Sequence, residues 1–165
     1  MKLLIHSLAL LGVAGATASA AQAPSTPIVT APAGKLQGVV EDGVQVFKGI
    51  PYAAPPVQAL RWNPPVPLPR WSGVRAAGAF GPACVQPQAK TASIYSGDPM
   101  PVSEDCLTLN IWAPANASDA PVFFWIHGGA LVAGSGREPL YDGKRMAERG
   151  VIVVSINYRL GVLGW

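Results

Sequence analysis

Residues Pro121 to Gly136 read PVFFWIHGGALVAGSG, an apolar run followed by a glycine-rich stretch. Val122 to Ile126 are apolar at every position, which is typical of a strand buried in the middle of a sheet and covered on both faces. The next four residues, His127 to Ala130, include two glycines and an alanine. We expect the chain to turn there with backbone N–H groups directed into open space. Such N–H groups can receive the negative charge that develops on an oxygen atom during a reaction.

A second apolar run, Val151 to Ile156, predicts another buried strand. Between the two runs, Asp142 to Arg149 form a short helix candidate, with Asp142 as its N-cap and Gly150 as the residue that ends it. A buried strand, a turn, a helix and a second buried strand make the βαβ unit of a parallel sheet. The sequence therefore predicts an α/β protein.

The N-terminal half predicts a different kind of sheet. Its strand candidates are short and antiparallel, and a hairpin turn is expected around Asp42 and Gly43. Seven prolines between Gly49 and Trp71 exclude both helix and sheet interior, so this segment is expected to lie as an extended cover over other elements. The strands expected outside the βαβ unit are Ile28–Thr30, Leu36–Val40, Val44–Lys48 and Leu107–Trp112.

The first twenty residues have the pattern of a secretory signal. Lys2 supplies a positive start, Leu3 to Ala16 form an apolar run, and a small-x-small cleavage site ends at Ala20. A membrane anchor is disfavoured because this run is shorter than the roughly 20 residues that span a bilayer. We expect cleavage after Ala20, a mature chain of residues 21–165 without a membrane span, and a secreted or periplasmic location.

Charge excludes some classes of partner. The formal net charge is +3, and the basic residues are scattered along the chain. Neither a nucleic acid nor an anionic membrane is therefore an expected partner. Eighteen glycines and seventeen prolines indicate many turns, but hydrophobic runs separate them, so the chain is expected to fold.

Cys84 and Cys106 are the only cysteines. A secretory signal would place them where disulfides persist, which favours pairing over free thiols. The bond would enclose 21 residues and contribute on the order of 3 kcal/mol through the unfolded state. Two cysteines alone cannot form a structural zinc site, and His127 is committed to the turn.

A nucleophile and a base are not recognisable in these 165 residues. There are two histidines, His6 and His127, and His6 lies in the predicted signal. A Ser-His-acid triad would therefore have to use His127, on the turn itself. The nucleophile pattern Gly-x-Ser-x-Gly is absent, because the nearest string, around Ser135, lacks the glycine two places before the serine.

Several motifs occur in the order found in type-B carboxylesterases, the cholinesterase-like branch of the α/β-hydrolases, and from about residue 27 onward the chain resembles that family. The resemblance implies the N-terminal part of an α/β-hydrolase fold, with a short antiparallel sheet followed by the first strands of a central, mostly parallel sheet. The motifs are Gly49-Ile50-Pro51-Tyr52-Ala53, Pro55-Pro56 with Arg61-Trp62, Glu104 to Trp112, His127-Gly128-Gly129-Ala130, and Asn157-Tyr158-Arg159.

The resemblance implies a serine carboxylesterase acting on small-molecule esters through an acyl-enzyme, with no metal or organic cofactor. The N–H groups of Gly129 and Ala130 are expected to form its oxyanion hole, with Gly128 supplying the turn. His127 is expected to support that turn by hydrogen bonds. Family members are several hundred residues long, and their serine, acid and histidine come later in the chain, so this chain is expected to end before the nucleophile.

The resemblance also pairs Cys84 with Cys106 and implies a salt bridge between Arg61 and Glu104 that anchors the proline-rich cover. A rival interpretation remains: relatives that have lost the serine use the same fold as a non-catalytic binding or adhesion module. Because the chain stops soon after Val151–Ile156, we expect the sheet to have an unfinished edge, and a self-sufficient stable monomer would favour the binding module.

Overall fold

The structure is a computed structural model and describes residues 26–88 and 100–164. The predicted signal, residues 1–20, lies outside the described residues.

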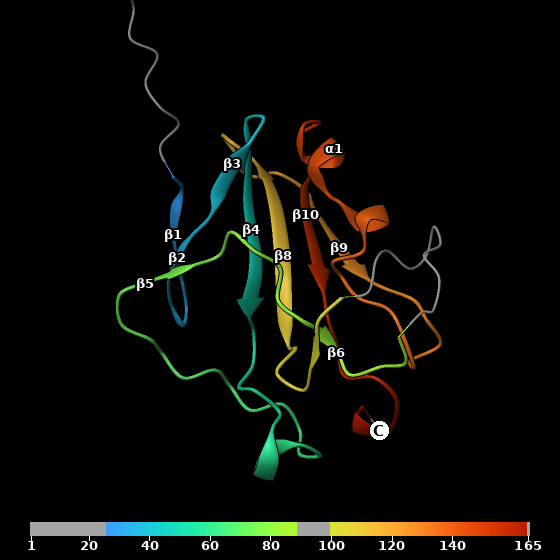
Figure 1. The fold of residues 1–165 in the computed structure, drawn as a ribbon. Coiled ribbons are helices and arrows are strands. Elements are labelled where there is room, and N and C mark those ends of the chain that lie inside the picture. Colours follow the sequence, from blue (N-terminus) through green and yellow to red (C-terminus); the bar gives the residue numbers. More distant parts are fainter. Residues whose placement is uncertain (1–25, 89–99, 165) are drawn as a thin grey trace, which may run out of the picture.

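The centre of the structure is a five-stranded sheet in the order β3-β4-β8-β10-β9 (Figure 1). Neighbouring strands are antiparallel except β10 and β9, which are parallel. The bounds are β3 Val39–Glu41, β4 Val44–Pro51, β8 Thr108–Pro114, β9 Val122–Ile126 and β10 Ile152–Ile156.

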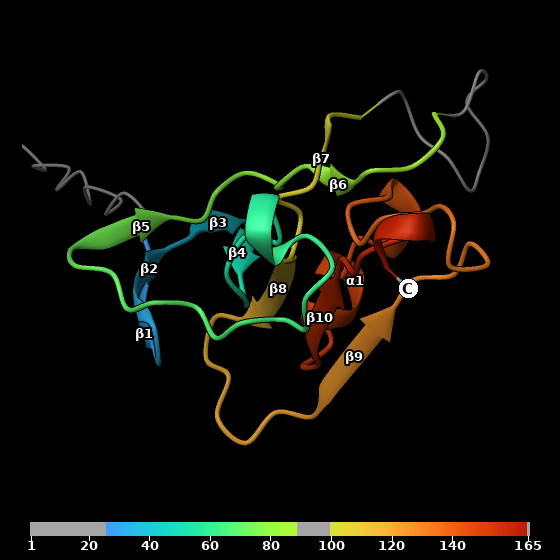
Figure 2. The ribbon, with the colours of Figure 1, turned by 90° about the horizontal axis from the view of Figure 1, so that it is seen from below.

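Two smaller sheets flank the central one (Figure 2). The first has the order β1-β2-β5, and the second pairs β6 with β7. Among the described residues, no helix is long and apolar enough to cross a membrane. The remaining bounds are β1 Ile28–Ala31, β2 Gly34–Gln37, β5 Val74–Ala76, β6 Ala83–Cys84, β7 Val102–Ser103, α1 Lys144–Ala147, and the 3₁₀ turns η1 Gln58–Leu60, η2 Pro139–Tyr141 and η3 Gly161–Leu163.

The strand predicted over Leu36–Val40 is wrong, because it is interrupted at Gly38 and its halves join different sheets. An added Cβ at Gly38 would lie 2.5 Å from the Val46 carbonyl oxygen, so the chain passes β4 at a distance that only glycine allows. The hairpin around Asp42 and Gly43 is confirmed. It belongs to the central sheet, however, and not to a separate N-terminal one.

The predicted βαβ unit is confirmed, since α1 connects β9 to its parallel neighbour β10. The helix is shorter than predicted, and its N-cap is Gly143 instead of Asp142. The Asp142 carboxylate still accepts the Lys144 N–H at 2.8 Å. A Cβ at Gly143 would lie 2.6 Å from the Cβ of Val153, so glycine lets the helix begin directly against the sheet.

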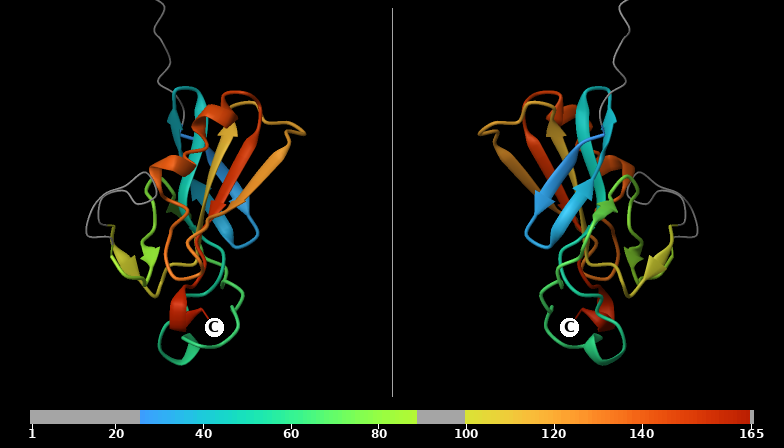
Figure 3. Two further views of the ribbon diagram at one scale, coloured as in Figure 1. Left: turned by 90° about the vertical axis from the view of Figure 1, so that its right-hand side faces the viewer. Right: turned by 90° about the vertical axis from the view of Figure 1, so that its left-hand side faces the viewer.

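The alternation of side chains on β4 explains how the sheet is covered. Val44 and Val46 point to the face on which α1 packs, where a core forms with Trp112, Ala147 and Val153. Phe47 points to the opposite face and packs with Leu36 of the small β1-β2-β5 sheet. Helix and small sheet therefore lie on opposite sides of the central sheet (Figure 3).

The prediction that Val122–Ile126 lies buried in the middle of a sheet is wrong for the described structure. The strand β9 pairs only with β10 there, because β10 inserts between β8 and β9. Val122, Phe124 and Ile126 are 61%, 53% and 59% exposed. No described element covers this face, so apolar side chains line an open sheet edge.

Candidate active site

The turn after β9 is built from residues with left-handed backbone conformations. Gly129, Ala130 and Leu131 have φ angles of 118°, 54° and 62°. The N–H groups of Val132 and Ala133 donate to the Gly129 carbonyl at 3.0 and 3.1 Å, which closes the turn. An added Cβ at Gly129 would lie 1.9 Å from the Ala133 carbonyl oxygen, so this position requires glycine.

The same geometry leaves backbone donors without acceptors. Gly128, Gly129 and Ala130 are all exposed. Within residues 26–88 and 100–164, no protein atom accepts a hydrogen bond from the N–H of Gly129 or Ala130. Two neighbouring N–H groups that follow the end of a strand can both donate to one negatively charged oxygen.

His127 lies under the turn and is only 3% exposed. Its ring stacks on Tyr158 with centroids 4.4 Å apart, and the Tyr158 hydroxyl donates to the His127 carbonyl at 2.7 Å. Nδ1 lies 2.8 Å from the Gly128 oxygen, and because a carbonyl can only accept, Nδ1 carries the proton. Burial lowers the pKa of His127, so the ring is neutral at pH 7. Its Nε2 is buried without a partner among the described residues.

Comparisons with known proteins match this chain to esterases. The model of the carboxylesterase family matches residues 25–165. The chain belongs to the carboxylesterase family. It is 49% identical to phenmedipham hydrolase of Pseudarthrobacter oxydans over 84% of this chain and 29% of that protein. It is also 49% identical to para-nitrobenzyl esterase of Bacillus subtilis, over 84% of this chain and 28% of that protein.

Solved structures agree with this assignment. A structure of PNB esterase superposes with a TM-score of 0.77 at 47% identity, covering 83% of this chain and 28% of the other. A carboxylesterase of Geobacillus stearothermophilus gives a TM-score of 0.73 at 47% identity, covering 84% and 27%. The predicted resemblance and the α/β-hydrolase fold class are confirmed. The chain spans less than a third of the length of these relatives.

In this carboxylesterase chain, Gly134 sets the position of the Gly128 carbonyl. Gly134 has a φ of 113°, and a Cβ added there would lie 2.5 Å from both the Gly128 oxygen and His127 Nδ1. The Gly128 C=O and the Gly129 N–H belong to one planar peptide group. Contacts that hold the Gly128 oxygen therefore also orient the Gly129 N–H.

Ser135, the serine nearest to a nucleophile pattern, is buried and hydrogen-bonded. It is 0% exposed, and its hydroxyl donates to Asn157 Oδ1 at 3.0 Å. The same Oδ1 accepts the Gly136 N–H at 2.9 Å, and Asn157 Nδ2 donates to the Pro82 carbonyl at 3.0 Å. Asn157 thus holds both Ser135 and Gly136 through buried hydrogen bonds.

The role of Asn157 was missed from the sequence, where it served only as part of a family motif. Its position directly after β10 could have indicated this role. The carboxyl ends of the parallel strands β9 and β10 meet at one edge of the sheet, so a residue that follows β10 lies near the turn that follows β9. Gln86 was also missed. It lies in an irregular stretch without periodicity, and no local pattern connects it to the turn after β9.

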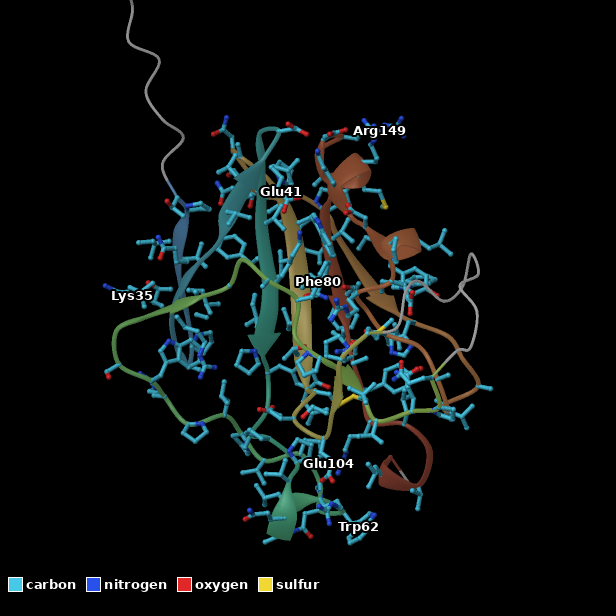
Figure 4. The ribbon with its side chains drawn as sticks, viewed as in Figure 1. Lys35, Glu41, Trp62, Phe80, Glu104 and Arg149 are labelled. Atoms are coloured by element: carbon cyan, nitrogen blue, oxygen red, sulfur yellow. A yellow bond between two sulfur atoms is a disulfide. The ribbon has the colours of Figure 1, made fainter. Side chains whose placement is uncertain are left out.

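The other predicted pairs are also close together in the structure. Cys84 and Cys106 are joined by a disulfide. Arg61 Nε lies 2.6 Å from Glu104 Oε2, and this contact raises the pKa of Arg61. Arg159 Nη1 donates to the Arg61 carbonyl at 2.9 Å, which connects the proline-rich segment to the chain after β10. Glu104 lies at the same end of the molecule as the exposed Trp62 (Figure 4).

Proposed function

We propose that this chain supplies the oxyanion hole of a serine carboxylesterase that hydrolyses small-molecule carboxylic esters. The observation that supports this most directly is the pair of adjacent, exposed N–H groups of Gly129 and Ala130, which have no protein acceptor within the described part of the chain. Membership of the carboxylesterase family supports it independently. The names of similar proteins, para-nitrobenzyl esterase and fumonisin B1 esterase, denote ester hydrolysis.

The proposed reaction is acyl transfer. A serine oxygen attacks the ester carbonyl carbon while a histidine accepts the serine proton, and the carbonyl oxygen becomes an anion. The N–H groups of Gly129 and Ala130 donate to that anion. Its collapse releases the alcohol, which takes the proton from the histidine, and water then hydrolyses the acyl-serine by the same steps. Loss of one such donor typically reduces the rate by about 100-fold to 1000-fold.

The serine, the acid and the base are proposed to come from protein beyond the 165 residues. Ser135 is fully buried and bound to Asn157, which argues against its acting as the nucleophile. His127 is buried, and its Nδ1 is engaged by the Gly128 oxygen, which argues against its acting as the base. Residues 21–165 are accordingly proposed to be the N-terminal part of a hydrolase domain.

We also propose export, with a signal of residues 1–20 cleaved after Ala20. The support is the charged start, the apolar run and the small residues at the cleavage site. The Cys84–Cys106 disulfide fits an oxidising compartment. Sequencing the N-terminus of the exported protein tests this, and a protein that begins at Met1 would contradict it.

A chimeric esterase tests the proposed oxyanion hole. It consists of residues 21–165 followed by the part of Bacillus subtilis para-nitrobenzyl esterase beyond the segment that this chain matches. We expect it to hydrolyse p-nitrophenyl acetate. The Ala130→Pro variant removes the N–H and also displaces the turn, because proline holds φ at about −65° whereas Ala130 has a φ of 54°. We expect its kcat to fall by at least about 100-fold to 1000-fold.

The matched control is Ala130→Gly, which keeps the N–H and tolerates the φ of 54°. We expect its kcat to stay within about threefold of the parent, since no donor is lost. Equal activity of the proline and glycine variants would refute the proposed donor role. A folded parent chimera that does not hydrolyse p-nitrophenyl acetate would contradict the proposed oxyanion hole, because the triad in the chimera comes from an esterase.

A further inference from the structure

The segment that follows the disulfide contacts the turn through one side chain, that of Gln86. Its Oε1 accepts the Gly134 N–H at 2.7 Å, and its Nε2 donates to the Gly134 carbonyl at 2.9 Å. Nε2 also donates to the Cys84 carbonyl at 3.0 Å. A primary amide suits this position because it offers a donor and an acceptor side by side, as the backbone of Gly134 does.

We propose that Gln86 is a positioning residue for the oxyanion hole, acting on the Gly129 N–H through Gly134. This inference rests on the proposed function of the turn. Gln86 itself would not contact the substrate. It would determine how well the Gly129 N–H is aligned with the oxygen that becomes charged.

Gln86 restricts the position of the Gly128 carbonyl by holding Gly134. With both backbone polar groups held by Gln86, Gly134 cannot rotate or withdraw without breaking two hydrogen bonds. Its Cα faces the Gly128 oxygen so closely that an added Cβ would lie 2.5 Å from that oxygen. The Gly128 oxygen is therefore enclosed by Gly134 on one side and bound by His127 Nδ1, at 2.8 Å.

The position of the Gly128 carbonyl in turn sets the direction of the Gly129 N–H, because both belong to one peptide group. The Gly128 oxygen and the Gly129 N–H are the two ends of one planar group, so fixing the oxygen fixes the direction of the N–H. No protein acceptor among the described residues holds the Gly129 N–H itself. Its direction thus depends on contacts to the oxygen, and Gln86 secures one of the two.

Further anchors of the turn come from the segment that follows β10. Tyr158 binds the His127 carbonyl, the Gly161 N–H donates to the Leu131 carbonyl at 2.8 Å, and Asn157 binds Ser135 and Gly136. In the part of the chain that the structure describes, Gln86 is the one side chain that hydrogen-bonds to Gly134. The disulfide at Cys84 holds the segment that presents it.

The test uses the chimeric esterase with Gln86→Met, which keeps the length of the side chain and removes its hydrogen bonds. We expect kcat to fall by about 10-fold to 100-fold, less than the loss of a whole donor, with KM changed by less than about threefold. The affinity for a trifluoromethyl ketone, whose adduct places an anionic oxygen at the same N–H groups, should fall by the same factor as kcat.

The matched control is Gln45→Met, which also removes a hydrogen bond from a glutamine amide to a carbonyl, that of Ala115 at 2.9 Å. Strands β4 and β9 run in the same direction in the sheet. Gln45 lies near the start of β4 and the turn follows the end of β9, so the two lie at opposite ends of the sheet. We expect no change in kcat or in ketone affinity. An equal loss in both variants would mean that Gln86 acts only on general stability, and would overturn the proposal.

Gln86→Glu provides a second variant if the methionine variant does not fold. A carboxylate cannot donate to the Gly134 carbonyl, but a protonated carboxyl group can, because it has the shape of the amide and one O–H. With the ordinary glutamate pKa of about 4.3, about 6% of the carboxyl groups are protonated at pH 5.5. For a carboxylate form that is about 30-fold slower than the parent or more, we therefore expect the ratio of the variant's kcat to that of the parent to rise by about threefold or more between pH 8 and pH 5.5. Dividing by the parent cancels the titration of the catalytic histidine, and a flat ratio would contradict the positioning role.

The two proposals can fail separately. If Ala130→Pro and Ala130→Gly are equally active, the oxyanion hole is misassigned, and the role of Gln86 fails with it. If Ala130→Pro loses activity as expected but Gln86→Met retains full kcat and ketone affinity, only the role of Gln86 is refuted.

Discussion

Replacement of Gly134 by alanine should disturb the oxyanion turn more than its backbone conformation alone predicts. The residue has a φ of 113°, a conformation that costs an L-residue about 1–3 kcal/mol. In addition, the new Cβ would lie 2.5 Å from the Gly128 oxygen, and this contact can be relieved only by moving backbone. Overpacking of this kind typically costs about 1–3 kcal/mol more. We expect Gly134→Ala to lower the free energy of unfolding by about 2–6 kcal/mol in total.

Gly150→Ala separates the two contributions. Gly150 has a φ of 90°, and a Cβ added there meets nothing within 4 Å, so only the conformational cost of about 1–3 kcal/mol applies. Urea unfolding of the chimeric esterase measures both variants, and p-nitrophenyl acetate hydrolysis measures kcat. We expect kcat to fall by about 100-fold in Gly134→Ala, because the displaced Gly128 carbonyl turns the Gly129 N–H away, and to be unchanged in Gly150→Ala. If Gly134→Ala and Gly150→Ala lowered the free energy of unfolding equally and had equal kcat, the close approach of Gly134 to the Gly128 carbonyl would be refuted.

Four further outcomes are expected. Thiol labelling of the exported protein, unfolded without reduction, should find no free sulfhydryl at Cys84 or Cys106, and two labelled cysteines would exclude the pairing. Burial lowers the pKa of His127, so below the ordinary histidine pKa of about 6.5 the unfolded state binds more protons than the folded state. Acid urea titrations should therefore show stability falling between about pH 7 and pH 5, less steeply in a His127→Asn chimera, and identical slopes would contradict the shift. The 165-residue chain alone should not hydrolyse p-nitrophenyl esters above background, whereas activity that disappears on Ser135→Ala would make Ser135 a nucleophile. Residues 21–165 should self-associate through the apolar β9 edge during size-exclusion chromatography, with more monomer after Phe124→Lys, and a parent that elutes as a stable monomer would contradict this.

Much of the local structure was predictable because it depends on neighbouring residues. The bounds of β9 agree with the apolar run over Val122–Ile126, and those of β10 differ by one residue from the run over Val151–Ile156. The hairpin at Asp42 and Gly43 followed from turn chemistry. The break at Gly38 was not predictable, because an isolated glycine in a strand pattern does not reveal which backbone will pass close to it.

The candidate site was predictable in part, for the same reason. Two glycines and an alanine after an apolar strand indicate exposed N–H groups wherever the strand lies. The protonation of His127 was not predictable, because it depends on burial and on the Gly128 oxygen. Gln86 was not predictable either, since 48 residues separate it from Gly134 and neither shows a pattern that involves the other.

Local sequence patterns were sufficient to predict the α/β class, the two strands of the βαβ unit and the turn that follows the first of them. These features rest on continuous runs of apolar side chains and on the backbone freedom of glycine, both of which act within a few residues. Only the tertiary structure decided that β10 lies between β8 and β9, which places β9 at an open edge. It also decided which groups hold the turn, namely the ring of Tyr158, the amide of Asn157 and the amide of Gln86. Such contacts join segments far apart in the chain, and the packing of the whole sheet, not any local preference, brings them together.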